Sequence, residues 1–139
     1  MDGLRNVAAL IGRILMAIIF LNSGIMKAMH TGMFHGIMLA HQMPAASVYP
    51  LLYASMVIEI VCSVLLILGL QTRWAAFILF LWLIPVTIVF HVLTGQEVEW
   101  LKNIAMMGGL LAFASFGPGA LSLDGAGTPA LESGARRAA

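Results

Sequence analysis

The sequence is built around long apolar runs, and the run at residues 48–70 has a single charged side chain, Glu59, near its middle. A helix needs about 20 apolar residues to cross the roughly 30 Å of hydrocarbon in a bilayer. Inside hydrocarbon the backbone finds no water, so only helices and closed barrels can span it. A run of this length therefore predicts a transmembrane helix with a carboxylic acid placed inside the membrane.

Composition supports the same class of protein. Of 139 residues, 61% are hydrophobic and 9% are charged, whereas soluble domains are about 45–50% apolar and about 25% charged. We therefore expect an all-α integral membrane protein embedded in the lipid bilayer. The formal net charge of +1 gives no strong field to attract nucleic acid, which we exclude as a partner.

The apolar runs predict one bundle of four transmembrane helices within a domain at residues 1–121. The predicted spans cover about residues 7–27, 48–70, 74–94 and 100–116. Residues 28–47 are rich in Met and His and form an outer loop, with a short surface helix expected at about 33–43. Residues 122–139 cannot bury a core and predict a low-complexity cytoplasmic tail. Pro85 removes a backbone donor and predicts a kink in the third span.

Lysine and arginine in the short loops predict the orientation. A cytoplasmic N-terminus places four arginines inside, namely Arg5, Arg73, Arg136 and Arg137. Lys27 and Lys102 then lie at outer ends of spans, so the positive-inside rule favours both termini in the cytoplasm. Arg13 lies about two turns into the first span. Its long side chain is expected to snorkel to the near surface, with an internal ion pair as the alternative.

Polar side chains within the spans collect in the predicted outer half of the membrane. The candidates are Asn22, Ser23, Lys27, Glu59, His91, Lys102 and Asn103. Polar groups in hydrocarbon cost free energy unless they find partners, so this asymmetry predicts a polar pocket open toward the outer leaflet or the periplasm. The alternatives are a hydrogen bond of Glu59 that holds the bundle, snorkelling lysines, and asparagines that join helices.

These residue types suit a quinone, whose reduction takes up protons together with electrons. Glu59 and His91 are the candidate catalytic residues because both can change protonation state. Asn22, Ser23, Lys27, Lys102 and Asn103 are the candidate ligand-binding residues. A quinone would be held without a covalent bond. Neither haem nor an iron–sulfur cluster is expected, because one histidine lies clearly in a span and the chain has one cysteine.

The outer loop allows a weaker alternative. It offers soft thioether and imidazole ligands that suit copper, at Met29, His30, Met33, His35, Met38 and His41. A flexible, methionine-rich interfacial helix explains the same composition, so no metal site is assigned.

Several short segments together resemble the DoxX family of small bacterial membrane proteins. They are Arg13, Phe-Leu-Asn-Ser-Gly-Ile-Met-Lys at residues 20–27, Glu59, Gly-Leu-Gln-Thr-Arg at 69–73, Phe90 with His91, Leu-Lys-Asn-Ile-Ala at 101–105, Gly-Pro-Gly at 117–119 and Ser-Leu-Asp at 122–124. The resemblance covers about residues 9–125 and implies a four-helix, multi-pass protein of the bacterial cytoplasmic (inner) membrane. The family takes its name from an archaeal system in which related subunits belong to a thiosulfate:quinone oxidoreductase associated with a terminal oxidase, and other members are linked to redox complexes. The outer loop is not part of this pattern.

The leading functional hypothesis is a small quinone- or lipid-binding subunit of a membrane redox assembly. As an enzyme component, it would at most be the membrane subunit of a quinone-linked oxidoreductase. The main alternative is a non-catalytic accessory subunit that packs against a larger membrane complex, because small residues in the fourth span allow close helix approach. Copper handling on the periplasmic side is the third.

Overall fold

A computed structural model describes residues 2–126, and in this part of the chain every regular element is a helix. In chain order the helices are α1 (Asp2–Met29), α2 (Thr31–Ala40), α3 (Ala45–Leu68), α4 (Thr72–Thr87), the π-helix η1 (Ile88–Val92), α5 (Glu97–Phe116) and α6 (Leu123–Ala126). The predicted all-α fold is confirmed for these residues. The predictions on the tail at 127–139, including Arg136 and Arg137, lie outside the described residues.

Three helical segments are long and apolar enough to cross a membrane. They are Gly3–Met29, Ala45–Leu68 and Thr72–Val92, which match the first three predicted spans. Helix α5 has 20 residues, enough for about 30 Å at ~1.5 Å per residue. However, Glu97, Glu99 and Lys102 lie in its first two turns. The fourth span therefore stays a prediction.

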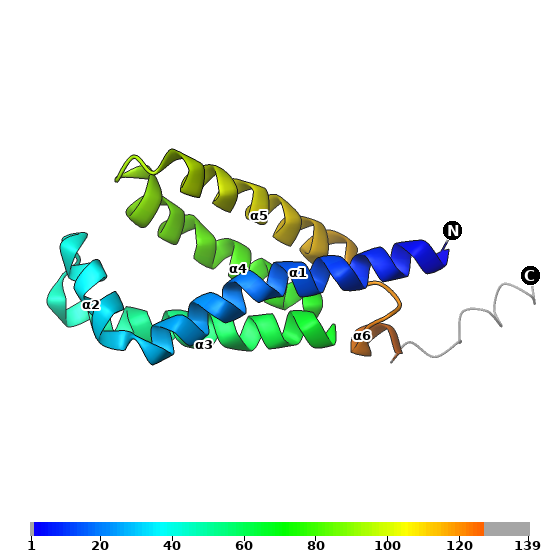
Figure 1. Cartoon of the computed structure of the whole chain (residues 1–139). Coiled ribbons are helices and arrows are strands. Elements are labelled where there is room, and N and C mark those ends of the chain that lie inside the picture. The colour runs from blue at the N-terminus through cyan, green and yellow to red at the C-terminus, as the bar shows by residue number, and fades with distance from the viewer. Residues whose placement is uncertain (1, 127–139) are drawn as a thin grey trace, which may run out of the picture.

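The long helices form two packed pairs, α1 with α3 and α4 with α5, and α3 joins the pairs through its contact with α4. Figure 1 shows α2 at one end of the molecule and α6 at the other, beside the end of α3. The two pairs lie close together near α6 and diverge toward α2 (Figure 1). We call these the α6 end and the α2 end.

Apolar side chains fill the bundle in two clusters. The larger one joins all four long helices and includes Ala17, Phe20, Leu66, Leu79 and Leu110. The smaller one lies under α2 and consists of Met38, Val48, Leu52 and Met56. Gly24 lets α1 approach α3 closely, since an added Cβ would lie 2.7 Å from Ile60 Cγ1. The larger cluster thus packs the interior between the helix pairs, while the smaller cluster packs α2 against α3.

The α6 end is closed by the segment that follows α5. Asp124 accepts hydrogen bonds from the backbone N–H groups of Gln71 and Thr72, at 3.0 and 3.2 Å, and so caps the N-terminus of α4. The Asp124 N–H donates to the Gly69 carbonyl at 3.0 Å. Residues 122–126 therefore pack against the membrane domain, although the sequence suggested that a tail begins at 122.

Arg13 is fully buried at this end and does not snorkel to the surface. Its guanidinium donates to the Leu121 carbonyl, and the nearby charge of Asp124 is favourable for it. Gly69 adopts the left-handed conformation at φ 67°, and a Cβ there would overlap the guanidinium. The prediction differs because the segment that covers Arg13 comes 108 residues later in the chain.

Candidate functional site

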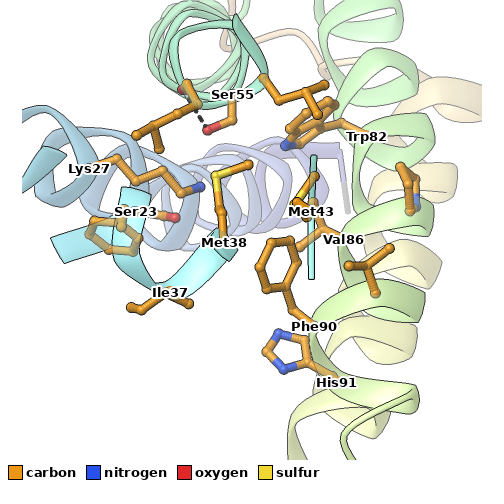
Figure 2. A pocket seen from close by; sticks show the side chains of 15 residues that line it. Ser23, Lys27, Ile37, Met38, Met43, Ser55, Trp82, Val86, Phe90 and His91 are labelled. Carbon is orange, nitrogen blue, oxygen red and sulfur yellow. Dashed lines mark hydrogen bonds between the residues drawn. The ribbon is translucent and has the colours of Figure 1, made fainter. Parts of the chain in front are cut away.

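A pocket of about 400 Å³ lies at the α2 end, between α1, α2, α3, α4 and η1. Its walls are mainly apolar and include Phe34, Ile37, Met38, Met43, Leu51, Leu52, Pro85, Val86, Val89 and Phe90. Five side chains with polar atoms also line it, namely Ser23, Lys27, Ser55, Trp82 and His91. Figure 2 shows Ser23 and Lys27 on one side of this space and Phe90 and His91 on the other. The pocket therefore combines a large apolar surface with a few polar groups.

A buried ion pair lies at the pocket on the α1 side, and Lys27 is its member that lines the space. Lys27 Nζ lies 2.5 Å from Glu59 Oε1, and the two side chains are 15% and 5% exposed. Trp82 Nε1 donates to the same carboxylate oxygen at 3.3 Å. The other oxygen, Glu59 Oε2, is buried without a hydrogen-bond partner among the described residues. Lys27 and Trp82, which both contact the carboxylate, line the pocket, and Glu59 itself does not.

Helix periodicity explains why these groups meet. Ser23 and Lys27 are four residues apart on α1, and Ser55 and Glu59 are four residues apart on α3, so each pair shares one helix face. Gly24 lies between the first two and has no side chain to hold the helices apart, since its added Cβ would lie 3.3 Å from Glu59 Cβ. The close approach of α1 and α3 brings the two faces together.

His91 lines the pocket and lies on an irregular helix. It lies in η1, the π-helix that begins three residues after Pro85 and follows α4 without a break. Proline cannot donate the usual helical hydrogen bond, and π-helical turns are often found at functional sites. His91 Nδ1 lies 3.1 Å from Gln96 Oε1, within hydrogen-bond distance.

The remaining predicted residues lie away from the pocket. Asn103 is buried and donates to Thr87 Oγ1 at 3.0 Å, which joins α5 to α4. Lys102 pairs with Glu99 on the surface. The hydrogen bond from Lys102 and its positive charge lower the pKa of the Glu99 carboxyl. Asn22 is exposed on α1.

The structure thus brings together Ser23, Lys27, Glu59 and His91, but not Asn22, Lys102 or Asn103. The catalytic and ligand-binding roles of all seven residues stay predictions.

Sequence reasoning missed Trp82 and the contribution of α2. Trp82 lines the pocket and donates to Glu59. A tryptophan in the middle of a predicted span was the available signal, because its N–H needs a partner when it is buried. Phe34 and Met38 of α2 form part of the pocket wall, although the sequence suggested a helix that lies in the membrane interface.

The methionines and histidines of the outer loop are placed mostly by packing contacts. His35 stacks on Tyr49 with ring centroids 4.4 Å apart, and His41 lies 4.8 Å from the Phe90 ring. Met38 is buried under α2. In residues 2–126, no three His, Cys, Asp or Glu side chains gather in a way that could hold a metal ion. The copper site stays a prediction.

Apolar helices of membrane-spanning length, with a charged pair buried between them, define this chain as a multi-pass membrane protein. The family model described as DoxX matches residues 8–92. The inner membrane protein YphA of Escherichia coli (strain K12) is 31% identical over 130 residues, which cover 86% of this chain and 90% of that relative. No solved structure matches significantly.

The chain therefore belongs to the DoxX family, and it is a multi-pass protein of the inner membrane. The family resemblance and the membrane location inferred from the sequence are confirmed.

Proposed function

We propose that this DoxX-family protein binds a small lipophilic molecule, quinone-like or lipid-like, in the pocket at the α2 end. In this proposal it acts as a small subunit of a membrane redox assembly. The observation that carries the proposal is a mainly apolar pocket of about 400 Å³ that is lined by Lys27, which forms a buried ion pair with Glu59.

The pocket has the usual character of a ligand site. Such sites occupy about 300–1,000 Å³, are lined mainly by apolar and aromatic side chains, and use a few polar groups to orient the ligand. Charged side chains inside a membrane are costly and mark functional sites by default. Lys27 lines the open space and its counter-charge, Glu59, does not, so a polar ligand group could reach the ammonium.

The proposal gives Glu59 the role of proton carrier. Reduction of a quinone takes up two electrons and two protons, and the electrons would come from a partner subunit. Glu59 has one buried oxygen without a partner among the described residues, and Lys27 connects it to the pocket. His91 offers a second group that can exchange a proton, on the opposite side of the space (Figure 2).

The proposed membrane arrangement has four spans, with α5 as the fourth and both termini in the cytoplasm. Arg5 lies in the first helical turns of α1 and Arg73 in the first turn of α4, at the α6 end. The last turn of α1, which contains Lys27, and the loop between η1 and α5 lie at the α2 end (Figure 1). The positive-inside rule favours the α6 end in the cytoplasm, and in this proposed orientation the pocket lies in the outer leaflet.

Extraction of lipophilic molecules from protein purified out of its native membrane tests the proposal. We expect a quinone or another lipophile to co-purify with the wild type and to be lost from Glu59→Gln, because Lys27 then has no counter-charge and the site favours anionic lipids instead. Glu99→Gln is the matched control, because Glu99 also pairs with a lysine but lies on the surface. If the wild type carries no such molecule and Glu59→Gln has no phenotype, the proposal is wrong.

A second candidate function is that of a non-catalytic accessory subunit. The observation in its favour is a row of small residues on α5, with Ala105, Gly108 and Ala112 all exposed. Such rows let a second helix approach closely in a membrane. A stable complex that keeps full activity after changes at both Glu59 and His91 would favour this function. Loss of the complex in Gly108→Leu would show that the contact lies on α5.

A further inference from the structure

The polar end of the pocket, where Ser23 and Lys27 lie, contains a paired charge. Lys27 and His91 are the titratable side chains among the lining residues, and they lie on opposite sides of the space (Figure 2). Lys27 is compensated by Glu59 at 2.5 Å, and both side chains are largely buried. A ligand group that reaches Lys27 therefore meets an ion pair and not an isolated cation.

The hydrogen-bonding groups that line this end are mainly donors, because Glu59, whose Oε2 has no partner among the described residues, is not a lining residue. The Lys27 ammonium has three N–H groups, and Glu59 uses one of them. The Trp82 N–H is directed to Glu59, and the Ser55 hydroxyl donates to the Leu52 carbonyl at 3.0 Å. The free donors are thus on Lys27, with the Ser23 hydroxyl beside it. The matching ligand group is a hydrogen-bond acceptor.

The charge of that acceptor decides between ligand classes. A carboxylate or phosphate at Lys27 would place a second negative group close to Glu59, in surroundings that are mostly apolar. Like charges that share a buried site disfavour each other's ionised form. A carbonyl or ester oxygen accepts the same hydrogen bond without adding charge, and the apolar walls accommodate the rest of such a molecule.

We infer that the pocket selects uncharged lipophiles with a carbonyl or ester oxygen at the polar end, and that it discriminates against lipids with an anionic head. This inference rests on the proposed function, because it names the ligand class of the same site. It makes Glu59 the residue that determines specificity by charge, although Lys27 is the group that contacts the ligand.

Methyl laurate and laurate form a matched pair of probes with the same acyl chain. Their binding to the purified full chain is measured by equilibrium binding of the radiolabelled compounds at about pH 9, far above the ordinary pKa of a carboxyl. We expect the wild type to bind the ester at least about tenfold more tightly than the acid, a difference of about 1.4 kcal/mol. Equal or tighter binding of laurate would overturn the inference.

Glu59→Gln keeps the shape of the side chain and removes its charge, so Lys27 becomes an uncompensated cation. Glu59→Gln is then expected to bind laurate more tightly than methyl laurate. Glu99→Gln should bind methyl laurate more tightly, as the wild type does. An unchanged order in a folded Glu59→Gln variant would also overturn the inference. If the variant does not fold, the wild-type order still decides the question.

Failure of the inference and failure of the proposed function give different results. If laurate binds well and methyl laurate does not, the pocket binds lipophiles but the assigned class is wrong. If neither probe binds, the proposed function fails and the inference fails with it. Lys27→Gln adds a second measurement, because loss of the ammonium donor weakens binding of the ester if Lys27 is the contact.

Discussion

The two ends of the bundle differ in what surrounds their buried charged side chains. At the α6 end, the guanidinium of Arg13 is covered by the chain itself, and Asp124 caps α4. At the α2 end, the helix pairs diverge, and Lys27, paired with Glu59, lines an open apolar pocket. The α6 end therefore has the features of a structural closure. The α2 end keeps a charged group where a ligand can reach it.

The largest loss of stability is expected from a substitution at Gly69, which packs against Arg13 at the α6 end. A Cβ there would overlap the Arg13 guanidinium, and φ is 67°. Gly69→Ala should lower the free energy of unfolding by more than about 3 kcal/mol. Gly95→Ala is the matched control, because φ is 71° and no atom lies within 4 Å of the added Cβ. It should cost only about 1–2 kcal/mol, from the backbone alone.

Chemical unfolding of the detergent-solubilised variants, followed by circular dichroism, gives both values. Equal losses in the two alanine variants would show that Arg13 is not packed against Gly69, and the closure at the α6 end would be wrong.

The next effect concerns the ion pair at the α2 end. Lys27→Met leaves Glu59 buried without its counter-charge and should destabilise the protein by about 3 kcal/mol. Glu59→Gln combined with Lys27→Met removes both charges and should recover most of this loss. Thermal unfolding of the single and double variants measures the coupling. Additive losses would mean that the two side chains do not interact as the structure shows.

A smaller effect is expected at the cap of α4. Asp124→Ala removes the acceptor for the Gln71 and Thr72 N–H groups and should cost about 1–2 kcal/mol. Ligand binding at the α2 end should not change, because the cap lies at the other end of the molecule. A variant that loses ligand while its unfolding curve is unchanged would contradict the separation of the two ends.

The smallest effect is expected for the exposed ion pair. Lys102→Gln breaks its contact with Glu99, where both side chains are more than 40% exposed, at 46% and 42%. Exposed pairs of this kind often contribute nothing measurable. Unfolding and ligand binding should both match the wild type. Loss of ligand in Lys102→Gln would restore Lys102 to the site and would require a different arrangement of α5.

Sequence alone predicted helices from the apolar runs, and the depth of each polar residue along its span. Similar depth in the membrane was enough to predict that Lys27 lies near Glu59 and that His91 is in the same region. It was not enough for Lys102 and Asn103, because residues at one depth can point to different sides of a helix. Asn103 points to Thr87 on the neighbouring helix and Lys102 to the surface.

Contacts between segments that are distant in sequence explain the other differences. The burial of Arg13 depends on residues 121–124, which come from the far end of the chain. The pocket wall depends on how α2 folds back over α3, through contacts such as that of Met38 with the cluster around Leu52. Neither contact leaves a local signal in the sequence.

The central claim, that the pocket holds a lipophilic ligand, is tested most directly by filling the pocket without changing any charge. Val86→Trp places a large ring in the pocket wall, and Ile88→Trp places the same ring on the exposed side of the π-helix. Lipophiles extracted from the full chain, purified from its native membrane, are identified by mass spectrometry. We predict one bound species in the wild type and in Ile88→Trp, and its loss in Val86→Trp. The same species in equal amount in all three proteins, or none in the wild type, would contradict the claim.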